Sequence, residues 1–238
     1  MIEINQLSFS YDKENQVIKN INIKIEKGKR IGIIGANGAG KSTLLRLIMG
    51  LEKPNSGEIF LDGTKIEKKS LPEIRKKCGY LFQSSENQLF MPTALDDVTF
   101  ALKNYGMTDN EAKIKGLSVL KDLGVLHLSE KPVWKMSGGE QKLVCIASIL
   151  ANNPEILIMD EPTNGLDPKN RKAIIDTINA LDKTKIIASH DLDMILDTCE
   201  RVILMSQGKI ISDGKAYDIL HNKDLLERNG LLLPLSVT

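Results

Sequence analysis

The chain has 238 residues, of which 42% are hydrophobic and 26% charged, enough for one large globular domain or for a core domain with a smaller insert. Its 32 Lys and Arg residues nearly cancel its 31 Asp and Glu residues, so the net charge of +1 gives no support for a nucleic-acid partner. Cys78, Cys145 and Cys199 are widely separated, which argues against a disulfide framework or a zinc site and indicates buried thiols. Because no apolar run is long enough to span a membrane and no signal peptide opens the sequence, we expect any membrane to be reached through a partner.

Two kinds of strand alternate with helical patterns along the chain. Alternating apolar residues predict antiparallel strands near the N-terminus, at about residues 2–11, 21–25 and 59–61. Short, nearly all-apolar runs at 31–34, 156–159, 186–188 and 202–205 predict strands of a sheet that is buried on both faces. From about residue 90 to 135 the pattern is mainly helical, with breaks near Gly106, Gly124 and Pro132. These patterns predict an α/β core with a helical insert.

The first chemical motif follows the apolar run 31–34 directly and matches the pattern G-x-x-x-x-G-K-[ST]. Apolar residues at helical spacing come next, so the order is strand, glycine loop and helix, which disfavours an ordinary glycine turn. Backbone N–H groups of such a loop surround phosphates, the lysine contacts the β- and γ-phosphates, and the serine binds Mg²⁺. The predicted ATP-binding residues are Gly35, Ala36, Asn37, Gly38, Ala39, Gly40, Lys41, Ser42 and Thr43.

A pair of carboxylates ends the apolar run at residues 156–159. Asp160 at the end of a strand can lie beside Mg²⁺, and Glu161 can orient the attacking water and accept its proton. The alternative is two solvated acids at the start of a loop. The phosphate-binding motif in the same chain favours the catalytic interpretation.

A third motif precedes an apolar helical pattern. Ser137, Gly138, Gly139 and Glu140 form the S-x-x-E capping box of a helix that we expect to bury one face and to stop near residue 152. A serine hydroxyl and glycine amides at a helix N-terminus also form an anion site. This loop cannot reach the phosphate enclosed by residues 35–42 of its own chain, unless two chains face each other.

The motifs at 35–42, 83, 137–140, 156–161, 164–167 and 190, in this order, resemble the ABC ATPases along almost the whole chain. The resemblance implies a P-loop NTPase core with an N-terminal antiparallel β subdomain. It also implies one domain over residues 1–238, with a helical subdomain inserted at about 90–152. ATP and Mg²⁺ are the implied ligands. The implied assembly is a dimer, of one kind of chain or two, in which each nucleotide lies between one chain's phosphate loop and the other's Ser-Gly-Gly loop.

The resemblance also assigns roles to single residues. Gln83 would contact Mg²⁺ and the attacking water, so the implied metal ligands are Ser42, Gln83 and Asp160. His190 would contact the γ-phosphate and steady Glu161. Asp167 would communicate across the dimer, and before Pro168 it is also a good helix N-cap.

Tyr11 would stack on adenine, although its alternation with Phe9 and Leu7 also suits a core face. The sequence departs mildly from the family at Met136 and Glu140. Residues 141–143 replace a stretch that usually carries Arg, which leaves the contacts of this helix open.

Residues 82–90, together with 92–93 and 96–98, resemble the ATPases of energy-coupling-factor importers, which take up vitamins or transition-metal ions. The ending at 231–236 resembles the shorter cobalt or nickel type. The implied partners are a transmembrane coupling protein and an integral substrate-binding protein, and the implied place is the cytoplasmic face of the cell membrane. A soluble, non-transport ABC ATPase, as in iron–sulfur assembly, would share every catalytic motif and remains the alternative.

Overall fold

Two sheets form the framework of the protein, a computed structural model of which describes residues 1–12 and 15–237. The smaller sheet has the strand order β2-β1-β4-β5 and is antiparallel. The larger sheet has the order β10-β9-β3-β8-β7-β6 and is parallel apart from β10 at one edge. The strands are β1 (Ile2–Ser10), β2 (Gln16–Ile25), β3 (Arg30–Ile34), β4 (Ser56–Leu61), β5 (Thr64–Lys65), β6 (Cys78–Leu81), β7 (Ile156–Asp160), β8 (Thr184–Ala188), β9 (Arg201–Ser206) and β10 (Lys209–Lys215).

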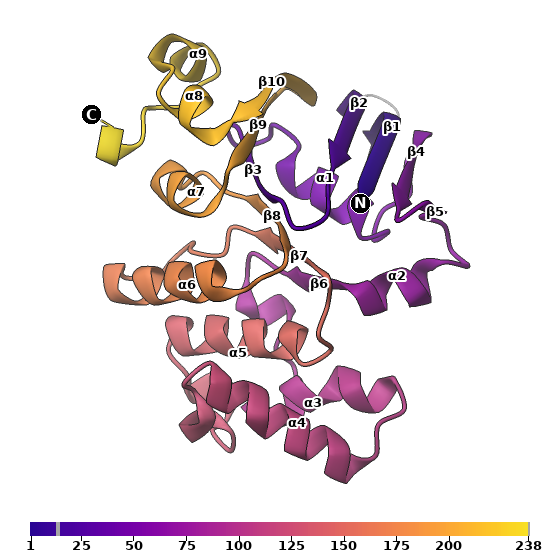
Figure 1. The fold of residues 1–238 in the computed structure, drawn as a ribbon, viewed down its shortest axis with the longest axis vertical. Coiled ribbons are helices and arrows are strands. Elements are labelled where there is room, and N and C mark those ends of the chain that lie inside the picture. The colour runs from indigo at the N-terminus through magenta and orange to yellow at the C-terminus, as the bar shows by residue number, and fades with distance from the viewer. Residues whose placement is uncertain (13–14, 238) are drawn as a thin grey trace.

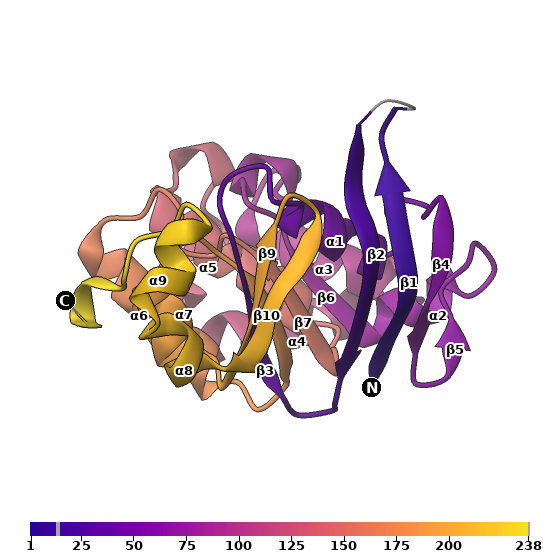
Figure 2. The same cartoon turned by 90° about the horizontal axis from the view of Figure 1, so that it is seen from above.

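The helices cover the larger sheet and extend the molecule at one end. Figure 1 shows α3, α4 and α5 stacked at the end opposite to α8 and α9, and Figure 2 shows β1, β2 and β4 on the side away from α6, α7 and α8. The α-helices are α1 (Lys41–Ile48), α2 (Leu71–Lys77), α3 (Ala94–Asn104), α4 (Asp109–Asp122), α5 (Gly138–Leu150), α6 (Pro168–Ala180), α7 (Leu192–Thr198), α8 (Ala216–Leu220) and α9 (Lys223–Arg228). The short 3-10 helices are η1 (Ser85–Asn87), η2 (Leu126–Leu128), η3 (Val133–Lys135) and η4 (Leu235–Val237).

The parallel sheet is buried on both faces, as its nearly all-apolar strands predict. In β7 all five residues are buried. Ile156 and Ile158 belong to the core shared with α1 and the antiparallel sheet, whereas Leu157 and Met159 belong to the core beneath α5, α6 and α7. Side chains of a strand alternate between its faces, so a strand between two cores needs apolar residues at every position. The α/β prediction and the antiparallel N-terminal strands are therefore confirmed.

The helices α3 and α4 begin and end at local sequence signals, whereas the burial of α5 depends on its contacts with other segments. Thr93 caps α3, Thr108 and Glu111 form a capping box at α4, and Gly106 separates the two helices with a φ of 94°. We predicted that α5 buries a single apolar face. Val144 and Cys145 are fully buried as well, so the buried surface of the helix is wider than predicted. The helix contacts α3 and α4 on one side and α6 and β6 on the other.

The prediction that the three cysteines are buried thiols is confirmed. Cys78, Cys145 and Cys199 are free and buried, and burial raises their pKa values to about 12, 11 and 11 respectively. Among the described residues, no helix combines the length and the apolarity needed to cross a lipid bilayer. The edge strand β10 was not predicted.

Candidate nucleotide-binding site

The glycine loop connects the end of β3 to the start of α1. Gly35 leaves no room for a side chain, because a Cβ atom there would lie 2.3 Å from the carbonyl oxygen of Met205. Gly40, with a φ of 103°, occupies the N-cap position of α1 and passes close to β2, where a Cβ would lie 3.0 Å from the carbonyl oxygen of Val17. The loop therefore requires glycine at both positions for steric and conformational reasons.

Lys41 lies inside the loop that precedes it. Its side chain is buried, and its Nζ donates to the carbonyl oxygens of Gly35 and Ala36 at 2.7 and 3.3 Å. Burial lowers the pKa of Lys41, although the carboxylates of Glu161 and Asp160 oppose this effect. Within the described residues, the first amide donating along α1 is that of Leu44, to the carbonyl of Gly40. The earlier amides of the helix are the donors that a helix N-terminus offers to an anion.

Oxygen ligands suited to Mg²⁺ lie beside the loop. Ser42 Oγ donates to Asp160 Oδ1 at 3.0 Å, and burial raises the pKa of this carboxyl against the effect of that hydrogen bond. Gln83 is exposed and lines the same pocket as Lys41, Ser42 and Glu161. In the described part of the chain, no group of three or more His, Cys, Asp or Glu residues could hold a metal ion. A hydroxyl, one carboxylate and an amide fit Mg²⁺, which completes its coordination with substrate phosphates and water.

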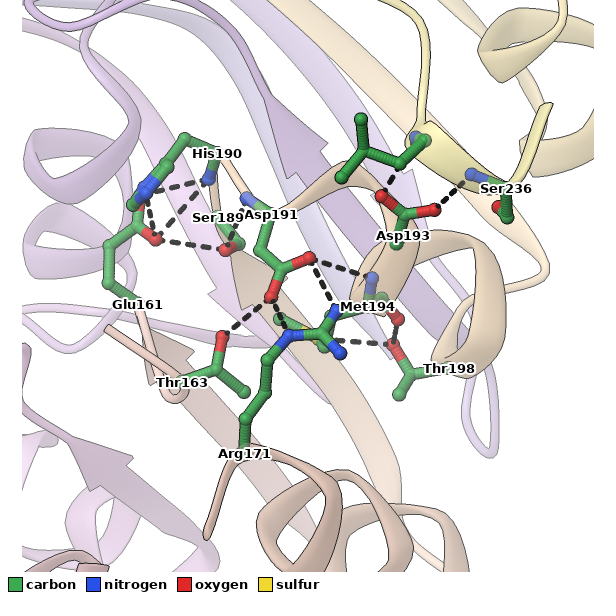
Figure 3. Close-up of polar contacts among 11 residues, drawn as sticks. Glu161, Thr163, Arg171, Ser189, His190, Asp191, Asp193, Met194, Thr198 and Ser236 are labelled. Atoms are coloured by element: carbon green, nitrogen blue, oxygen red, sulfur yellow. Dashed lines mark hydrogen bonds and ion pairs between the residues drawn. The ribbon is translucent and has the colours of Figure 1, made fainter. Parts of the chain in front are cut away.

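The carboxylate of Glu161 is held by donors from the next strand. Because β7 and β8 are parallel neighbours, their carboxyl ends place Glu161 beside Ser189 and His190. Glu161 Oε2 accepts from Ser189 Oγ at 2.9 Å and lies 2.8 Å from His190 Nδ1, while the His190 amide donates to Oε1 at 3.1 Å (Figure 3). The Glu161 side chain is 8% exposed, and its backbone has a φ of 48°. The geometry thus fixes one carboxylate at the edge of the pocket that contains Lys41.

The Ser-Gly-Gly loop forms the N-terminus of α5. Ser137 and Glu140 make the reciprocal capping box, and Lys131 Nζ binds the Glu140 carboxylate at 2.8 Å. Ser137 and Gly138 are exposed, whereas Gly139 is buried. The described lining of the phosphate-loop pocket includes no residue of 137–140. Gly138 instead lines an adjoining, larger cavity that also contains Ser42 and Asp160.

Two further candidates have clear positions. Tyr11 is 55% exposed, so it does not continue the core face of Phe9 and Leu7, which are 5% and 0% exposed. Its hydroxyl lies 3.3 Å from Thr43 Oγ1, at the end of the phosphate-binding motif. Asp167 is the N-cap of α6, because its Oδ1 accepts from the amides of Lys169 and Asn170, both at 3.0 Å.

Sequence reasoning missed two residues that shape the site, Ser189 and Lys142. Ser189 donates to Glu161, and its position directly before His190 was the available signal. Lys142 is 2% exposed, and its Nζ donates to the carbonyl oxygens of Gln83 and Phe82 at 2.9 and 3.2 Å. The lysine therefore ties the segment that carries Gln83 to the helix that begins at the Ser-Gly-Gly loop. A lysine within the apolar pattern of α5 was the only local sign of this contact.

A phosphate-type loop at the carboxyl end of a parallel sheet, with a carboxylate pair beside it, defines the class of P-loop nucleoside triphosphatases. A family model described as ABC transporter matches residues 18–164. An energy-coupling factor transporter ATP-binding protein of Methanothermobacter thermautotrophicus is 39% identical, with 98% of this chain and 77% of that protein covered.

Solved structures agree with this match. CbiO1 from Clostridium perfringens, described as part of the ABC transporter complex cbiONQ, has a TM-score of 0.84 and 34% identity, covering 95% of this chain and 93% of that one. The ATP-binding cassette MJ0796, solved as a dimer bound to ADP and Pi, has a TM-score of 0.82 and 31% identity, covering 91% and 99%. The chain belongs to the ABC transporter family of ATP-binding proteins, and it is an ATPase with the P-loop fold.

Proposed function

We propose that this chain is the ATP-hydrolysing subunit of an importer of the energy-coupling-factor class, bound to the cytoplasmic face of the cell membrane. The proposal is supported by the name of the Methanothermobacter relative and by the cbiONQ complex to which the Clostridium structure belongs. Its partners would be a second ATPase subunit, identical or homologous, a transmembrane coupling protein and an integral substrate-binding protein. The cargo would be cobalt or nickel ions or a vitamin, and the separate binding protein would hold it.

The nucleotide would lie along the phosphate loop. The amides of residues 35–43 and the amine of Lys41 would bind the phosphates, and the exposed ring of Tyr11 would stack on adenine. Ser42, Asp160 and Gln83 would hold Mg²⁺, which neutralises phosphate charge when it is bound. The donor set beside the loop supports this assignment.

Glu161 would act as the general base. The observation that carries this role is that Glu161 lines the same pocket as Lys41 and Ser42. Among the described residues, Oε1 accepts a hydrogen bond from the His190 amide alone, so it is the oxygen better placed to accept a proton from water. The water oxygen would bond to the γ-phosphorus while the bond to the β–γ bridging oxygen breaks. His190 would contact the γ-phosphate while its Nδ1 holds Glu161.

The second half of each site would come from another subunit. Ser137, Gly138, Gly139 and Glu140 would bind the γ-phosphate held by the partner's phosphate loop, and Asp167 would lie at the same interface. The exposure of Ser137 and Gly138 supports this arrangement, because an exposed loop is open to contact with a second chain. Closure of two subunits on two nucleotides, followed by hydrolysis and reopening, would drive the membrane components.

Replacement of Lys41 tests the nucleotide site. Lys41→Ala is expected to raise the Kd for ATP about 10- to 100-fold, because a hydrogen bond to a charged group contributes about 1.5–3 kcal/mol. Isothermal titration calorimetry measures this change. Lys185→Met is the control, because it removes another buried lysine whose Nζ donates to the carbonyl of Ile178, away from the loop. An unchanged Kd for Lys41→Ala would contradict the role of the loop.

The importer proposal is tested by purifying the tagged subunit from gently solubilised membranes of its native cell. We expect a transmembrane coupling protein and a small integral binding protein to co-purify, and the ligand of the latter would identify the cargo. Recovery of soluble partners alone would overturn the importer proposal in favour of a non-transport ABC ATPase, with the ATPase chemistry unaffected.

A further inference from the structure

A second polar cluster lies directly behind Glu161 and is centred on the carboxylate of Asp191. Arg171 on α6 binds it with two parallel hydrogen bonds, from Nε to Oδ2 at 2.6 Å and from its terminal nitrogen to Oδ1 at 2.7 Å. Thr163 Oγ1, on the loop after Glu161, lies 3.1 Å from Oδ2, and the amide of Met194 donates to Oδ1 at 3.0 Å. Figure 3 shows these donors converging on one side chain from three segments of the chain.

The cluster connects to Glu161 through Ser189. The amide of Asp191 donates to Ser189 Oγ at 3.0 Å, and this hydroxyl donates to Glu161 Oε2 at 2.9 Å. A serine hydroxyl has one proton, so accepting the amide of Asp191 leaves that proton for Glu161. Ser189 is fully buried, which leaves it little freedom to choose another partner.

Four hydrogen bonds hold the carboxylate of Asp191 in one orientation against Arg171. Burial tends to raise the pKa of Asp191, but the guanidinium of Arg171 and the amide of Met194 hold that pKa below its usual value. Each carboxylate oxygen accepts two donors, so an amide in either orientation would place an NH₂ group against N–H donors. The side chains of Arg171 and Asp191 are 33% and 19% exposed.

The start of the same helix would lie at the subunit interface of the proposed dimer, because its N-cap, Asp167, is proposed to face the second subunit. Helix α6 begins after Asp167, and its Asn170 packs against Gly139, where an added Cβ would lie 2.4 Å from the Asn170 side chain. Arg171 is the next residue. A change at the subunit interface that shifts the start of α6 therefore acts directly on the carboxylate of Asp191.

We propose that Asp191, held by Arg171, is a positioning residue that sets the orientation of the catalytic carboxylate of Glu161 through the hydroxyl of Ser189. Helix α6 thereby links the face that binds the second subunit to the base that activates water. This inference rests on the proposed role of Glu161. A displaced base lowers the rate of the chemical step, whereas nucleotide binding by the phosphate loop depends on other residues.

The experiment uses Arg171→Lys, which keeps the positive charge but removes the bidentate hydrogen bonds to Asp191. We expect kcat for ATP hydrolysis to fall about tenfold while KM and the Kd for ATP stay within twofold of the wild type. Arg201→Lys is the matched control, because Arg201 binds Asp213 with the same two-pronged geometry, both bonds 2.6 Å long, between β9 and β10. Arg201→Lys is expected to lower the melting temperature comparably and to leave kcat unchanged.

A double-mutant cycle tests whether the effect travels through Ser189. With Ser189→Ala in the background, Arg171→Lys is expected to lower kcat by less than twofold, since the connection is already broken. Equal effects of Arg171→Lys in both backgrounds, or a loss of kcat matched by Arg201→Lys, would overturn the inference. Wild-type turnover in Glu161→Gln would instead remove the proposed function on which it rests, so the two failures are distinguishable.

Discussion

Glu161→Gln is expected to lower kcat for ATP hydrolysis about 10²- to 10⁴-fold, the usual contribution of a general base, while the Kd for ATP remains near that of the wild type. Oε2 of Glu161 faces the hydroxyl of Ser189 and Nδ1 of His190. A glutamine would keep its carbonyl oxygen toward these donors and toward the His190 amide, which lies 3.3 Å from Oε2, and would turn its NH₂ group toward the position of the water. The amide cannot accept the proton, although the shape of the site is preserved.

Steady-state phosphate release and calorimetric titration of ATP measure the two quantities for Glu161→Gln. Asp97→Asn is the matched control, because Asp97 is also a buried carboxylate that accepts from backbone amides, those of Phe90 and Met91, at 3.2 Å. The control is expected to lose stability but to keep its turnover per folded molecule. Turnover by Glu161→Gln at the wild-type rate would remove Glu161 from the reaction.

Gly138→Asp is expected to abolish most of the turnover, by about 100-fold or more, without destabilising the subunit. Within its own chain a Cβ at this position meets only Leu166 Cδ2, at 3.9 Å, among the described residues. An acidic residue in the first turn of α5 also suits the helix dipole. In a closed dimer, however, the new charge would face the γ-phosphate bound by the partner. Like charges brought together at an interface cost several kcal/mol, which corresponds to at least two orders of magnitude in rate.

The melting temperature and the ATPase activity of Gly138→Asp are compared with those of a second variant, Gly139→Ala. The latter places a methyl group 2.4 Å from the Asn170 side chain of the same chain, so it is expected to lower the melting temperature. Gly138→Asp should melt as the wild type does and still bind ATP at its own phosphate loop. Full activity in Gly138→Asp would mean that the Ser-Gly-Gly loop does not contact nucleotide.

The sequence predicts the local parts of this molecule well. The strand, loop and helix around Lys41 are contiguous in the sequence. The all-apolar run before Asp160 indicates directly that this strand is buried on both faces of the sheet. The capping box at residues 137–140 is likewise local, so its spacing predicted where α5 begins. The buried surface of α5 was predicted too narrow because this helix packs against α3 and α4 and also against α6 and β6. Periodicity alone does not show that a helix is buried on two sides.

The contacts that organise the site depend on which strand ends are neighbours. Nothing in the sequence near Glu161 indicates that β8 lies beside β7, yet this adjacency brings Ser189 and His190 to its carboxylate. The clamp between Arg171 and Asp191 joins residues that are 20 positions apart, and Lys142 reaches carbonyl groups about 60 positions away. Such contacts follow from topology, so the residue types suggest only that donors and acceptors exist.

The most direct test of the composite site is the mass of Glu161→Gln in solution, measured by light scattering without and with Mg-ATP. We expect the mass to double from the 26.4 kDa of one chain when Mg-ATP is added, and to remain at one chain when Gly138→Asp is added to the same variant. A single chain that binds ATP tightly, hydrolyses it in the wild type and never dimerises would contradict a site shared between two subunits.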